Sequence, residues 1–439
     1  DSKWQFTTVE STIMTPSKTS YLIIGGGVFG ASTAYFLSKS HPDASVVLVD
    51  RSPSFPCSLA ASHDFNKIIR ADYGNPFYCQ LAVEAREAWK SDPLFKPFYY
   101  ESGMVVLEDT GLGRRIIKNY EDLKVKPNIS MVQPNELKTL YSGLFEDTDY
   151  QGVGDVFINH NSGWAEATPA LQAVISASVE NGVKYVQGDI ETLTFSERGD
   201  CTGARTQDGR ALLADSVILS TGAGTAKLLA RSAPRRQEVQ SGDRITAAAV
   251  VTAIIKLTEE QMKEFRQCPV FIHDIAGVFG QILPPTPDGL LKFCVDASFK
   301  NTSLDEASGQ MISAPPDSPD QGQHTIPDSL KAECRRVVKG IFGKIFSNYD
   351  FDSLRICWDG ITPNQDFIVS GHPRCQNLYI ATGGSFHGWK FLPIIGKYVV
   401  QMLNGELDEG TEKRWAWDRE QTGSAHEKII PKRELSDLL

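Results

Sequence analysis

Apolar and polar positions follow a regular order near the start of the chain, between residues 20 and 51. Residues 22–24 form a short apolar run that ends in three glycines, as expected for a parallel strand buried on both faces. Residues 28–38 have helical periodicity, and residues 45–49 form the next strand. The pattern predicts a complete βαβ unit with a glycine-rich turn after its first strand.

The turn of this unit carries a dinucleotide-binding fingerprint. Gly25, Gly27 and Gly30 satisfy G-x-G-x-x-G. The first glycine allows the tight turn, the second lets the backbone approach a pyrophosphate, and the third lets helix and strand pack closely. Asp50 follows Gly30 by 20 residues, where an acid binds an adenosine ribose hydroxyl. We predict a dinucleotide site, and a glycine-rich turn in another α/β sheet is the alternative.

Later segments predict a return to this sheet and a second domain. Residues 214–224 and 378–384 are apolar strands that end in glycines, as in strands that approach a cofactor, although ordinary buried strands have the same pattern. Strand-rich segments predict an antiparallel second sheet, and helical patterns separate the strands. The strand-rich segments are residues 245–256, 270–282 and 289–296, and the helices are predicted over residues 77–90, 169–181 and 330–345.

The segments between these elements are predicted from their turn residues. Residues 62–70, SHDFNKIIR, read as a polar turn beside the cofactor fold. Residues 99–108 read as a strand pair with its turn at Gly103, and residues 112–141 as helical segments broken by prolines. Residues 307–329 are rich in Pro, Ser, Asp and Gln and predict an exposed loop.

Composition narrows the class of protein. The chain of 439 residues is longer than one hydrophobic core supports, so two domains are expected. A formal charge of −10 disfavours nucleic acid and anionic membranes as partners, and no apolar run could span a bilayer. The 8 cysteines include no C-x-x-C pair, which argues against structural zinc and a disulfide framework and favours a reducing, cytoplasmic location. Met14 could be an initiator, so residues 1–13 are left out of the fold argument.

Several motifs together resemble the monomeric sarcosine oxidase family of flavoprotein amine oxidases, whose relatives include fungal amadoriases, pipecolate oxidases and saccharopine oxidases. The resemblance spans residues 20–403. Besides the fingerprint, its most specific parts are NKIIRADYG, RICW followed by DFIVSGHP, and ATGGSFHGWKFLPIIGK. The sequence NKIIRADYG is most similar to the saccharopine and pipecolate oxidase branch.

The resemblance implies FAD held covalently by Cys357 through its 8α-methyl position. A thiolate can add to an electrophilic flavin quinone methide, and the resulting thioether makes the flavin a better electron acceptor. From the residues alone, Cys357 reads as a buried apolar cysteine. The cofactor-binding set expected from the fingerprint and the resemblance is Gly25, Gly27, Val28, Phe29, Gly30, Asp50, Arg51, Ser62, Lys67, Cys357, Gly384, Phe386, Gly388 and Lys390.

The resemblance also gives roles to three cations. Lys292 stands in an apolar strand, where an unpaired ammonium is costly, and a lysine there often extends from an edge strand to water. It matches the family lysine that assists oxygen reduction, since a fixed cation stabilises developing superoxide. Arg70 and Lys390 match the pair that binds a substrate carboxylate. An arginine at position 70 favours an unglycated amino acid or another small carboxylate.

Two positions depart from the family pattern. Asp296 stands where sarcosine oxidases have a histidine and amadoriases a glutamate, and Asp359 stands where sarcosine oxidases have a tyrosine. These changes favour a more polar substrate end, one with a hydroxyl or an amine, over sarcosine or a standard Amadori compound. Asp359, Asp296 and His63 are expected to tune the protonation of the substrate amine.

The fold implied is α/β with an α+β second domain, a Rossmann-like FAD-binding domain plus an antiparallel-sheet substrate domain of the D-amino-acid-oxidase and sarcosine-oxidase type. The FAD-binding domain is expected to be discontinuous. Its predicted segments are residues 16–102, 165–235 and 355–420, with the substrate domain at 103–164 and 236–354 and tails at 1–15 and 421–439.

The predicted activity is oxidation of a secondary amine or N-substituted amino acid by hydride transfer to the flavin, giving an imine, with O2 reduced to H2O2. The alternatives are a fructosyl amino acid oxidase, an amine oxidase of fungal secondary metabolism whose imine is captured in ring formation, a dehydrogenase with another acceptor, and a flavin-binding protein without turnover. A monomer is expected from the family. Some fungal relatives are peroxisomal, but this chain ends Asp437-Leu438-Leu439 rather than in a peroxisomal tripeptide.

Overall fold

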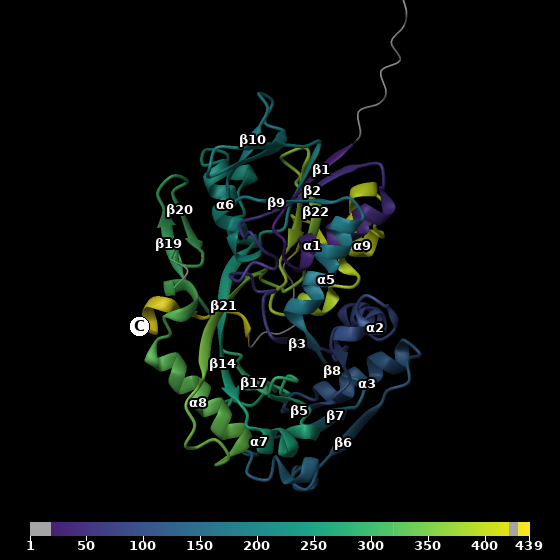
Figure 1. The fold of residues 1–439 in the computed structure, drawn as a ribbon, viewed down its shortest axis with the longest axis vertical. Coiled ribbons are helices and arrows are strands. Elements are labelled where there is room, and N and C mark those ends of the chain that lie inside the picture. The colour runs from purple at the N-terminus through teal and green to yellow at the C-terminus, as the bar shows by residue number, and fades with distance from the viewer. Residues whose placement is uncertain (1–18, 319, 421–428) are drawn as a thin grey trace, which may run out of the picture.

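The computed structural model describes residues 19–318, 320–420 and 429–439. Two large sheets organise these residues, one in the upper and one in the lower part of the molecule in Figure 1. The predicted tail at residues 1–15, with Met14, lies outside the described residues.

The upper sheet has six strands and contains the predicted βαβ unit. Its central strand β1 (Ser20–Ile24) pairs in parallel with β2 and β13, and only the edge strand β22 runs antiparallel to its neighbour. The strand order is β22 (Ile368–Gly371), β23 (Leu378–Thr382), β13 (Ser216–Leu219), β1, β2 (Ser45–Asp50) and β9 (Lys184–Gln187). The two returning strands predicted near residues 214–224 and 378–384 are therefore β13 and β23.

Each face of this sheet is covered because strand side chains alternate between the faces. Ile23 and Leu48 pack against helices α1 (Val28–Ser40), α5 (Ala167–Glu180) and α9 (Ile395–Asn404). Leu22 and Ile24 belong to a second cluster with helix α6 and a small sheet (Figure 1). These are α6 (Thr225–Ser232), β10 (Ile190–Phe195), β11 (Cys201–Thr206) and β12 (Ala211–Leu213).

The lower sheet has ten strands and is mostly antiparallel. It contains the predicted strands of the second domain, and helix α8 (Asp328–Phe342) packs on it through Cys334, Val337 and Ile341. The strand order is β24 (Arg433–Glu434), β18 (Phe299–Lys300), β14 (Thr246–Lys256), β17 (Leu290–Val295), β16 (Gly280–Leu283), β15 (Val270–His273), β5 (Met104–Glu108), β7 (Asp155–Asn159) and β6 (Ile129–Val132), with β21 (Ser353–Ile361) also paired to β14.

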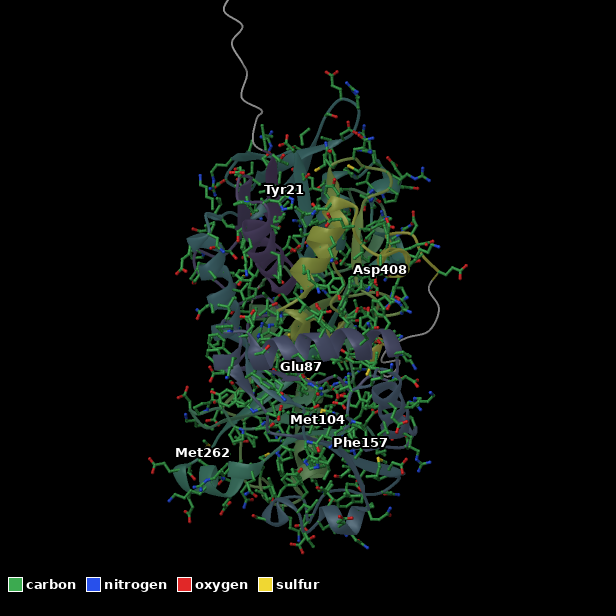
Figure 2. All side chains as sticks on the ribbon, turned by 90° about the vertical axis from the view of Figure 1, so that its right-hand side faces the viewer. Tyr21, Glu87, Met104, Phe157, Met262 and Asp408 are labelled. Carbon is green, nitrogen blue, oxygen red and sulfur yellow. The ribbon has the colours of Figure 1, made fainter. Side chains whose placement is uncertain are left out.

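A third group of elements lies between the two large sheets. Helix α2 (Pro76–Ser91) crosses the middle of the molecule in Figure 2, where Glu87 marks it. Asn75 caps its start by accepting hydrogen bonds from the amides of Phe77 and Tyr78. The same group contains a small three-stranded sheet, in the order β3 (Asn66–Ile69), β8 (Gly163–Glu166) and β4 (Tyr99–Tyr100).

The remaining elements are short and lie at the edges of the large sheets. Helix α3 (Leu112–Asp122) follows β5, α4 (Pro134–Leu137) follows β6, and α7 (Glu259–Glu264) follows β14. The others are a hairpin of β19 (Thr302–Asp305) and β20 (Gln310–Ser313), and α10 (Glu409–Trp415).

The predicted fold class is confirmed, but several local predictions were wrong. Residues 99–108 form no strand pair, because β4 and β5 join different sheets and the Gly103 amide donates to the Ser162 carbonyl. Residues 129–132 form a strand rather than part of a helix, since prolines at both ends stop a helix and β7 offers a free edge. In the polar turn at 62–70, residues 66–69 are strand β3.

Parts of the predicted exposed loop and of the predicted C-terminal tail pack against the fold. Part of the predicted loop 307–329 is strand β20, and Gln323 is buried with its Nε2 donating to the Leu59 carbonyl at 2.9 Å. In the predicted tail 421–439, β24 pairs with β18 and the side chain of Leu435 is buried in the lower core.

The predicted domain limits do not all coincide with the ends of elements. The limit at 164/165 falls inside β8, and the limit at 354/355 falls inside β21, which pairs with β14 over its whole length. Strand β21 thus belongs to the lower sheet, while β22 follows it in the upper sheet. The division of the chain into two domains stays a prediction.

Candidate active site

A cavity of about 900 Å³ is walled by residues of both large sheets. Its upper wall comes from the turns after β1, β2, β13 and β23, and its lower wall from β14, β16, β17 and β21. Ligand sites commonly lie outside the carboxyl ends of parallel strands, where these turns are. Of the predicted site residues, all except Gly30 and His63 line this cavity.

The glycine fingerprint has the geometry that its sequence predicts. Gly25 has φ +103°, and a Cβ there would lie 2.5 Å from the Ser220 carbonyl oxygen. A Cβ at Gly30 would lie 1.9 Å from the Gly25 carbonyl oxygen, so only glycine lets α1 approach β1 this closely. Gly30 therefore shapes the cavity from behind rather than lining it.

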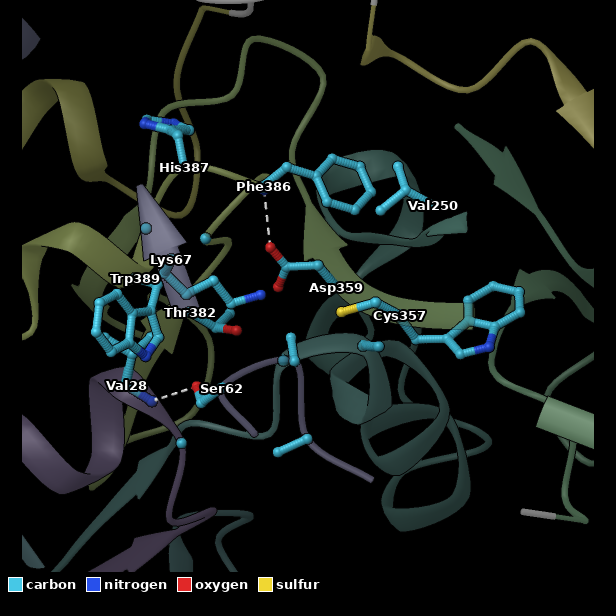
Figure 3. A pocket seen from close by; sticks show the side chains of 18 of the residues that line it. Val28, Ser62, Lys67, Val250, Cys357, Asp359, Thr382, Phe386, His387 and Trp389 are labelled. Carbon is cyan, nitrogen blue, oxygen red and sulfur yellow. Dashed lines mark hydrogen bonds between the residues drawn. The ribbon is translucent and has the colours of Figure 1, made fainter. Parts of the chain in front are cut away.

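Two side chains fix the start of helix α1. The Asp50 carboxylate accepts a hydrogen bond from the Gly26 amide at 2.7 Å, and the Ser62 hydroxyl accepts one from the Val28 amide at 3.0 Å (Figure 3). Phe29 is buried behind this turn, whereas Arg51 is exposed at the rim of the cavity. The helix start therefore presents amides and small polar groups to the cavity, as an anion requires.

Cys357 lies on β21 with its thiol in the cavity wall. Its side chain is 6% exposed and packs with Val250, Cys294 and Phe386. In Figure 3 the sulfur points into the same space as the Lys67 ammonium and the Asp359 carboxylate. A thiol here is accessible to a ligand in the cavity and shielded from bulk water.

Asp359 orients the turn that follows β23. Its carboxylate accepts hydrogen bonds from the Phe386 and Gly360 amides, each at 2.8 Å. Phe386 has φ +62°, a conformation that costs energy for a residue with a side chain, and the charged acceptor stabilises it. Burial raises the pKa of Asp359, and the two amides and Lys67 partly offset this. Asp359 thus fixes the backbone at Phe386, between the predicted cofactor-binding residues Gly384 and Gly388.

Lys292 is paired, which the sequence did not predict. Its Nζ lies 2.5 Å from Oδ2 of Asp64 and donates to the Asn66 carbonyl at 3.0 Å. The same oxygen of Asp64 lies 2.8 Å from Nζ of Lys67. Burial lowers the pKa of Lys292, and Asp64 opposes that shift.

Arg70 and Lys390 come together around one phenol. The Arg70 guanidinium lies 4.9 Å from the centre of the Tyr73 ring, and Nζ of Lys390 donates to the Tyr73 hydroxyl at 2.9 Å. Lys390 also donates to the His387 carbonyl at 2.8 Å, so both of its acceptors are neutral oxygens. Burial, with Arg70 adding to it, lowers the pKa of Lys390 well below its usual value. The pair is suited to an incoming carboxylate.

Asp296 lines the part of the cavity formed by β16 and β17. Its Oδ1 accepts a hydrogen bond from Nε2 of Gln281 at 3.0 Å. Burial raises the pKa of Asp296 to about 7, and the nearby Asp274 adds to the shift. A carboxyl that titrates near neutral pH can donate or accept a proton under working conditions.

His63 does not line the cavity, and its backbone is bound by Arg355. The Arg355 guanidinium donates to the carbonyls of Ser58, Ala60 and His63, the first two at 3.2 and 2.9 Å, and so holds residues 58–63 against β21. This contact uses the His63 backbone and leaves its imidazole away from the cavity lining. The predicted tuning role of His63 has no support in this geometry.

Sequence reasoning missed three residues that shape this site. Asp64 and Arg355 are charged residues next to predicted site residues, in SHDFNK and RIC, but only the fold shows which groups they contact. Tyr73 stands in ADYG, directly after the predicted carboxylate-binding Arg70. The position of each residue beside a motif was the available signal, and it does not identify the groups that the residue contacts.

The residues present fit FAD. The cavity is long enough to run from the helix start at Val28 to Cys357, and Asp50 stands at the ribose position of the fingerprint. The hydroxyl of Ser220, on the cavity wall, is buried and makes no hydrogen bond within the described part of the chain, so a bound polar group can satisfy it. The described residues contain no group of three or more His, Cys, Asp or Glu placed to hold a metal ion. Nor does any helix among them have the length and apolarity to cross a bilayer.

Comparisons with known proteins agree with this site. The chain is 27% identical to L-saccharopine oxidase of Schizosaccharomyces pombe, covering 92% of this chain and 94% of that protein. It is 22% identical to monomeric sarcosine oxidase of Arthrobacter sp., covering 87% and 91%. A crystal structure of a thermally stable fructosyl peptide oxidase mutant superimposes with a TM-score of 0.83 at 26% identity, covering 96% and 98%.

These relatives confirm the predicted resemblance to sarcosine, saccharopine and fructosyl amino acid oxidases. The model of the family described as FAD dependent oxidoreductase matches residues 20–402, which include the upper sheet, every strand of the lower sheet except β24, and every residue of the cavity named above. The chain belongs to this family of FAD-dependent oxidoreductases.

Proposed function

We propose that this protein oxidises the C–N bond of a secondary amine or N-substituted amino acid, with FAD attached to Cys357 and O2 as the electron acceptor. The observation that carries the proposal is that one cavity is lined by Arg70 and Lys390, by Lys292, and by Cys357. A carboxylate-binding pair, a buried cation and a shielded thiol in one space suit an oxidase of amino acids better than a protein that only binds a flavin.

The carboxylate end of the substrate is assigned to Arg70 and Lys390. Both side chains contact Tyr73, so the phenol fixes the distance between the two cations. An entering carboxylate would stabilise the buried Lys390 ammonium, whose charge its neutral acceptors compensate poorly. The pair therefore orients the substrate with its amine toward the cavity centre.

The remaining residues control charge around the reacting amine. Bound FAD supplies the two-electron acceptor that takes hydride from the carbon of the C–N bond. The two cations disfavour a third positive charge nearby, so they favour the neutral amine from which hydride can leave. Lys292 provides a fixed positive charge in the wall for the reduction of O2.

A monomer and a cytoplasmic location complete the proposal, and both rest on the family resemblance and on composition. The H2O2 product follows from O2 as acceptor. The imine either hydrolyses or is captured by a nucleophile within the product, as in fungal secondary metabolism.

Oxidation of fructosyl amino acids is the second candidate, favoured by the TM-score of 0.83 to a fructosyl peptide oxidase. Asp296, with Gln281 beside it, could receive the hydroxyl groups of a sugar. A small carboxylate substrate needs only Arg70 and Lys390, whereas a sugar adduct also needs this acidic end. Peroxide release from fructosyl amino acids and not from other secondary amino acids would favour this candidate.

The first test is acid precipitation of the flavin-containing protein. Flavin absorbance is expected to stay in the pellet for the native protein and to move to the supernatant for Cys357→Ala, because only a covalent bond survives denaturation. Cys294→Ala is the matched control, since Cys294 is buried in the same wall and packs with Cys357. Flavin in the supernatant of the native protein would contradict covalent attachment.

The second test names the substrate class. The enzyme is mixed without oxygen with secondary amino acids, saccharopine and fructosyl amino acids, and bleaching of the flavin is recorded. In aerobic turnover of the substrate identified in this way, Arg70→Met is expected to raise KM by at least about tenfold, because a charge-assisted pair is lost. An unchanged KM would remove the assigned carboxylate site.

A further inference from the structure

One oxygen atom of Asp64 holds two ammonium groups in the cavity wall. Oδ2 lies 2.5 Å from Nζ of Lys292 and 2.8 Å from Nζ of Lys67. The Asp64 side chain is 8% exposed and that of Lys292 is 5% exposed, so water screens this contact weakly. The cluster joins the loop before β3, β3 itself and β17.

Further hydrogen bonds fix the orientation of Asp64. Its other oxygen, Oδ1, accepts from the Phe65 amide at 2.8 Å. Its own amide donates to the Thr168 hydroxyl at 3.2 Å, and its carbonyl accepts from the Thr168 amide at 3.0 Å. The start of α5 thus holds the backbone of Asp64, and Oδ2 is left to face the two lysines.

The balance of charge in this cluster depends on Asp64. Lys292 faces Asp64, Lys67 and the Cys294 thiol of its own strand. Lys67 faces Asp64 and His63 of the loop before β3, and the Arg355 guanidinium, the Cys357 thiol and the Asp359 carboxylate of β21. Among these groups, Asp64 is the carboxylate that acts on both ammonium ions. Burial opposes ionisation of Asp64, but the two lysines outweigh it and lower its pKa. Without this carboxylate, two cations would repel each other inside the wall.

We propose that Asp64 is a positioning residue that keeps Lys292 charged and fixed at one point of the cavity wall, and through Lys292 sustains the reduction of O2. This inference rests on the role given to Lys292 in the proposed function. Lys67 is the second cation held by the same carboxylate, and it limits how strongly Asp64 can neutralise Lys292. The three side chains therefore leave a net positive charge on this wall.

Removing the Asp64 charge has a specific consequence. Burial and the repulsion from Lys67 then both act against the Lys292 ammonium, so Lys292 loses its proton at lower pH than in the native protein. Oxygen reduction should still proceed at low pH, where Lys292 is charged, and fail as pH rises. A variant that was merely misfolded would be impaired at every pH.

The experiment follows reoxidation without needing the natural substrate. The holoenzyme is reduced anaerobically with dithionite and mixed with O2 from pH 6 to 10, and return of the oxidised flavin spectrum is timed. Asp64→Asn is expected to reoxidise like the native enzyme at pH 6 and at least about tenfold more slowly at high pH, approaching Lys292→Met. Asp122→Asn is the charge-matched control, because Asp122 is exposed in an ion pair on α3.

A second variant and a chemical readout separate charge from structure. Lys67→Met in the Asp64→Asn background removes the repulsion, so the fall in rate should move back to higher pH. Reductive methylation of the holoenzyme at pH 8, read by mass spectrometry, should label Lys292 faster in Asp64→Asn, because only neutral amines react.

The outcomes separate the two hypotheses. Reoxidation by Asp64→Asn that follows the native pH profile, while Lys292→Met is slow, would overturn the role of Asp64 alone. A uniform loss of rate at all pH values, without faster labelling of Lys292, would do the same. Fast reoxidation by Lys292→Met would instead refute the assignment of Lys292 in the proposed function.

Discussion

Burial outweighs the nearby Arg70 guanidinium at Asp296, and this gives the residue a testable pH dependence. Its carboxyl has a pKa raised to about 7 in the folded protein, mainly by burial, against about 3.9 in an unfolded chain. Between these values the folded protein holds a proton that the unfolded chain has lost. Rising pH therefore favours unfolding, and Asp296 makes stability fall as pH increases from about 4 to about 7.

Asp296→Asn should remove this slope. The free energy of unfolding of the native protein relative to the variant is expected to decline with pH by at most about 1.4 kcal/mol per pH unit and to level off above pH 7. Urea unfolding at pH 4.5, 5.5, 6.5 and 7.5 measures it, with Cys357→Ala in both proteins so that the flavin can be removed. Parallel curves for the two proteins would show that the carboxyl titrates normally.

Other residues of the site show which contacts can be predicted from the sequence. Gly25, Gly27 and Asp50 form a local motif, so their spacing alone predicts their positions around the start of α1. The contact of Lys292 with Asp64 joins residues 228 positions apart, and no periodicity encodes it. Spacing identifies groups within one element, whereas partners across the cavity depend on how the sheets meet.

At the scale of elements, the close packing of α1 on β1 depends on a missing side chain. A methyl group at position 30 would lie 1.9 Å from the Gly25 carbonyl oxygen, which is backbone and cannot turn aside. Gly30→Ala must therefore push the helix away from the strand. We expect a loss of stability of about 1–3 kcal/mol and a protein purified with less FAD.

Denaturant unfolding and the ratio of flavin to protein absorbance test this prediction. Gly371→Ala is the matched control, because a methyl group there meets no atom closer than 3.7 Å and Gly371, on β22, does not line the cavity. Equal stability of Gly30→Ala and the native protein would mean that α1 does not need this close approach.

Elements were predictable where their own residues decide the structure. The amphipathic pattern of α2 and the apolar runs of β1 and β2 were enough to locate them. Strands β6 and β24 have weak patterns of their own and form because a partner strand offers hydrogen bonds. Such strands cannot be predicted without knowing the sheet that they join.

At the scale of the whole molecule, residues 429–439 tie the end of the chain to the lower sheet. Nη1 of Arg433 lies 2.6 Å from Oε1 of Glu333 on α8, and Nη2 donates to the Ala297 carbonyl at 2.5 Å. Both side chains are less than one third exposed. The Arg433–Glu333 ion pair should therefore contribute to the stability of the native protein more than a surface pair does.

A double-mutant cycle with Arg433→Ala and Glu333→Ala measures this contribution. We expect a coupling free energy of about 1 kcal/mol in urea unfolding. The exposed pair Lys118–Asp122 serves as control and should give a smaller coupling, because water screens it. Additive effects of the Arg433 and Glu333 substitutions would place the end of the chain outside the cooperative fold.

The overall arrangement was predictable in outline, since the glycine-ended strands β13 and β23 signalled that the chain returns to the first sheet. The points at which the chain passes from one large sheet to the other were not predictable. Strand β21 carries Cys357 in the lower sheet and leads within seven residues of its end to β22 in the upper sheet, and no change of composition marks that step.

Arg355 holds residues 58–63 entirely through carbonyl oxygens. Every residue has a backbone carbonyl group, so these hydrogen bonds do not depend on which side chains the loop carries. Evolution can therefore change the residues at positions 58, 60 and 63 while the loop keeps its shape, provided that position 355 remains arginine. In a comparison of natural sequences, the residue at position 63 should vary freely among relatives that keep Arg355. Its identity should not correlate with the substrate that each relative oxidises.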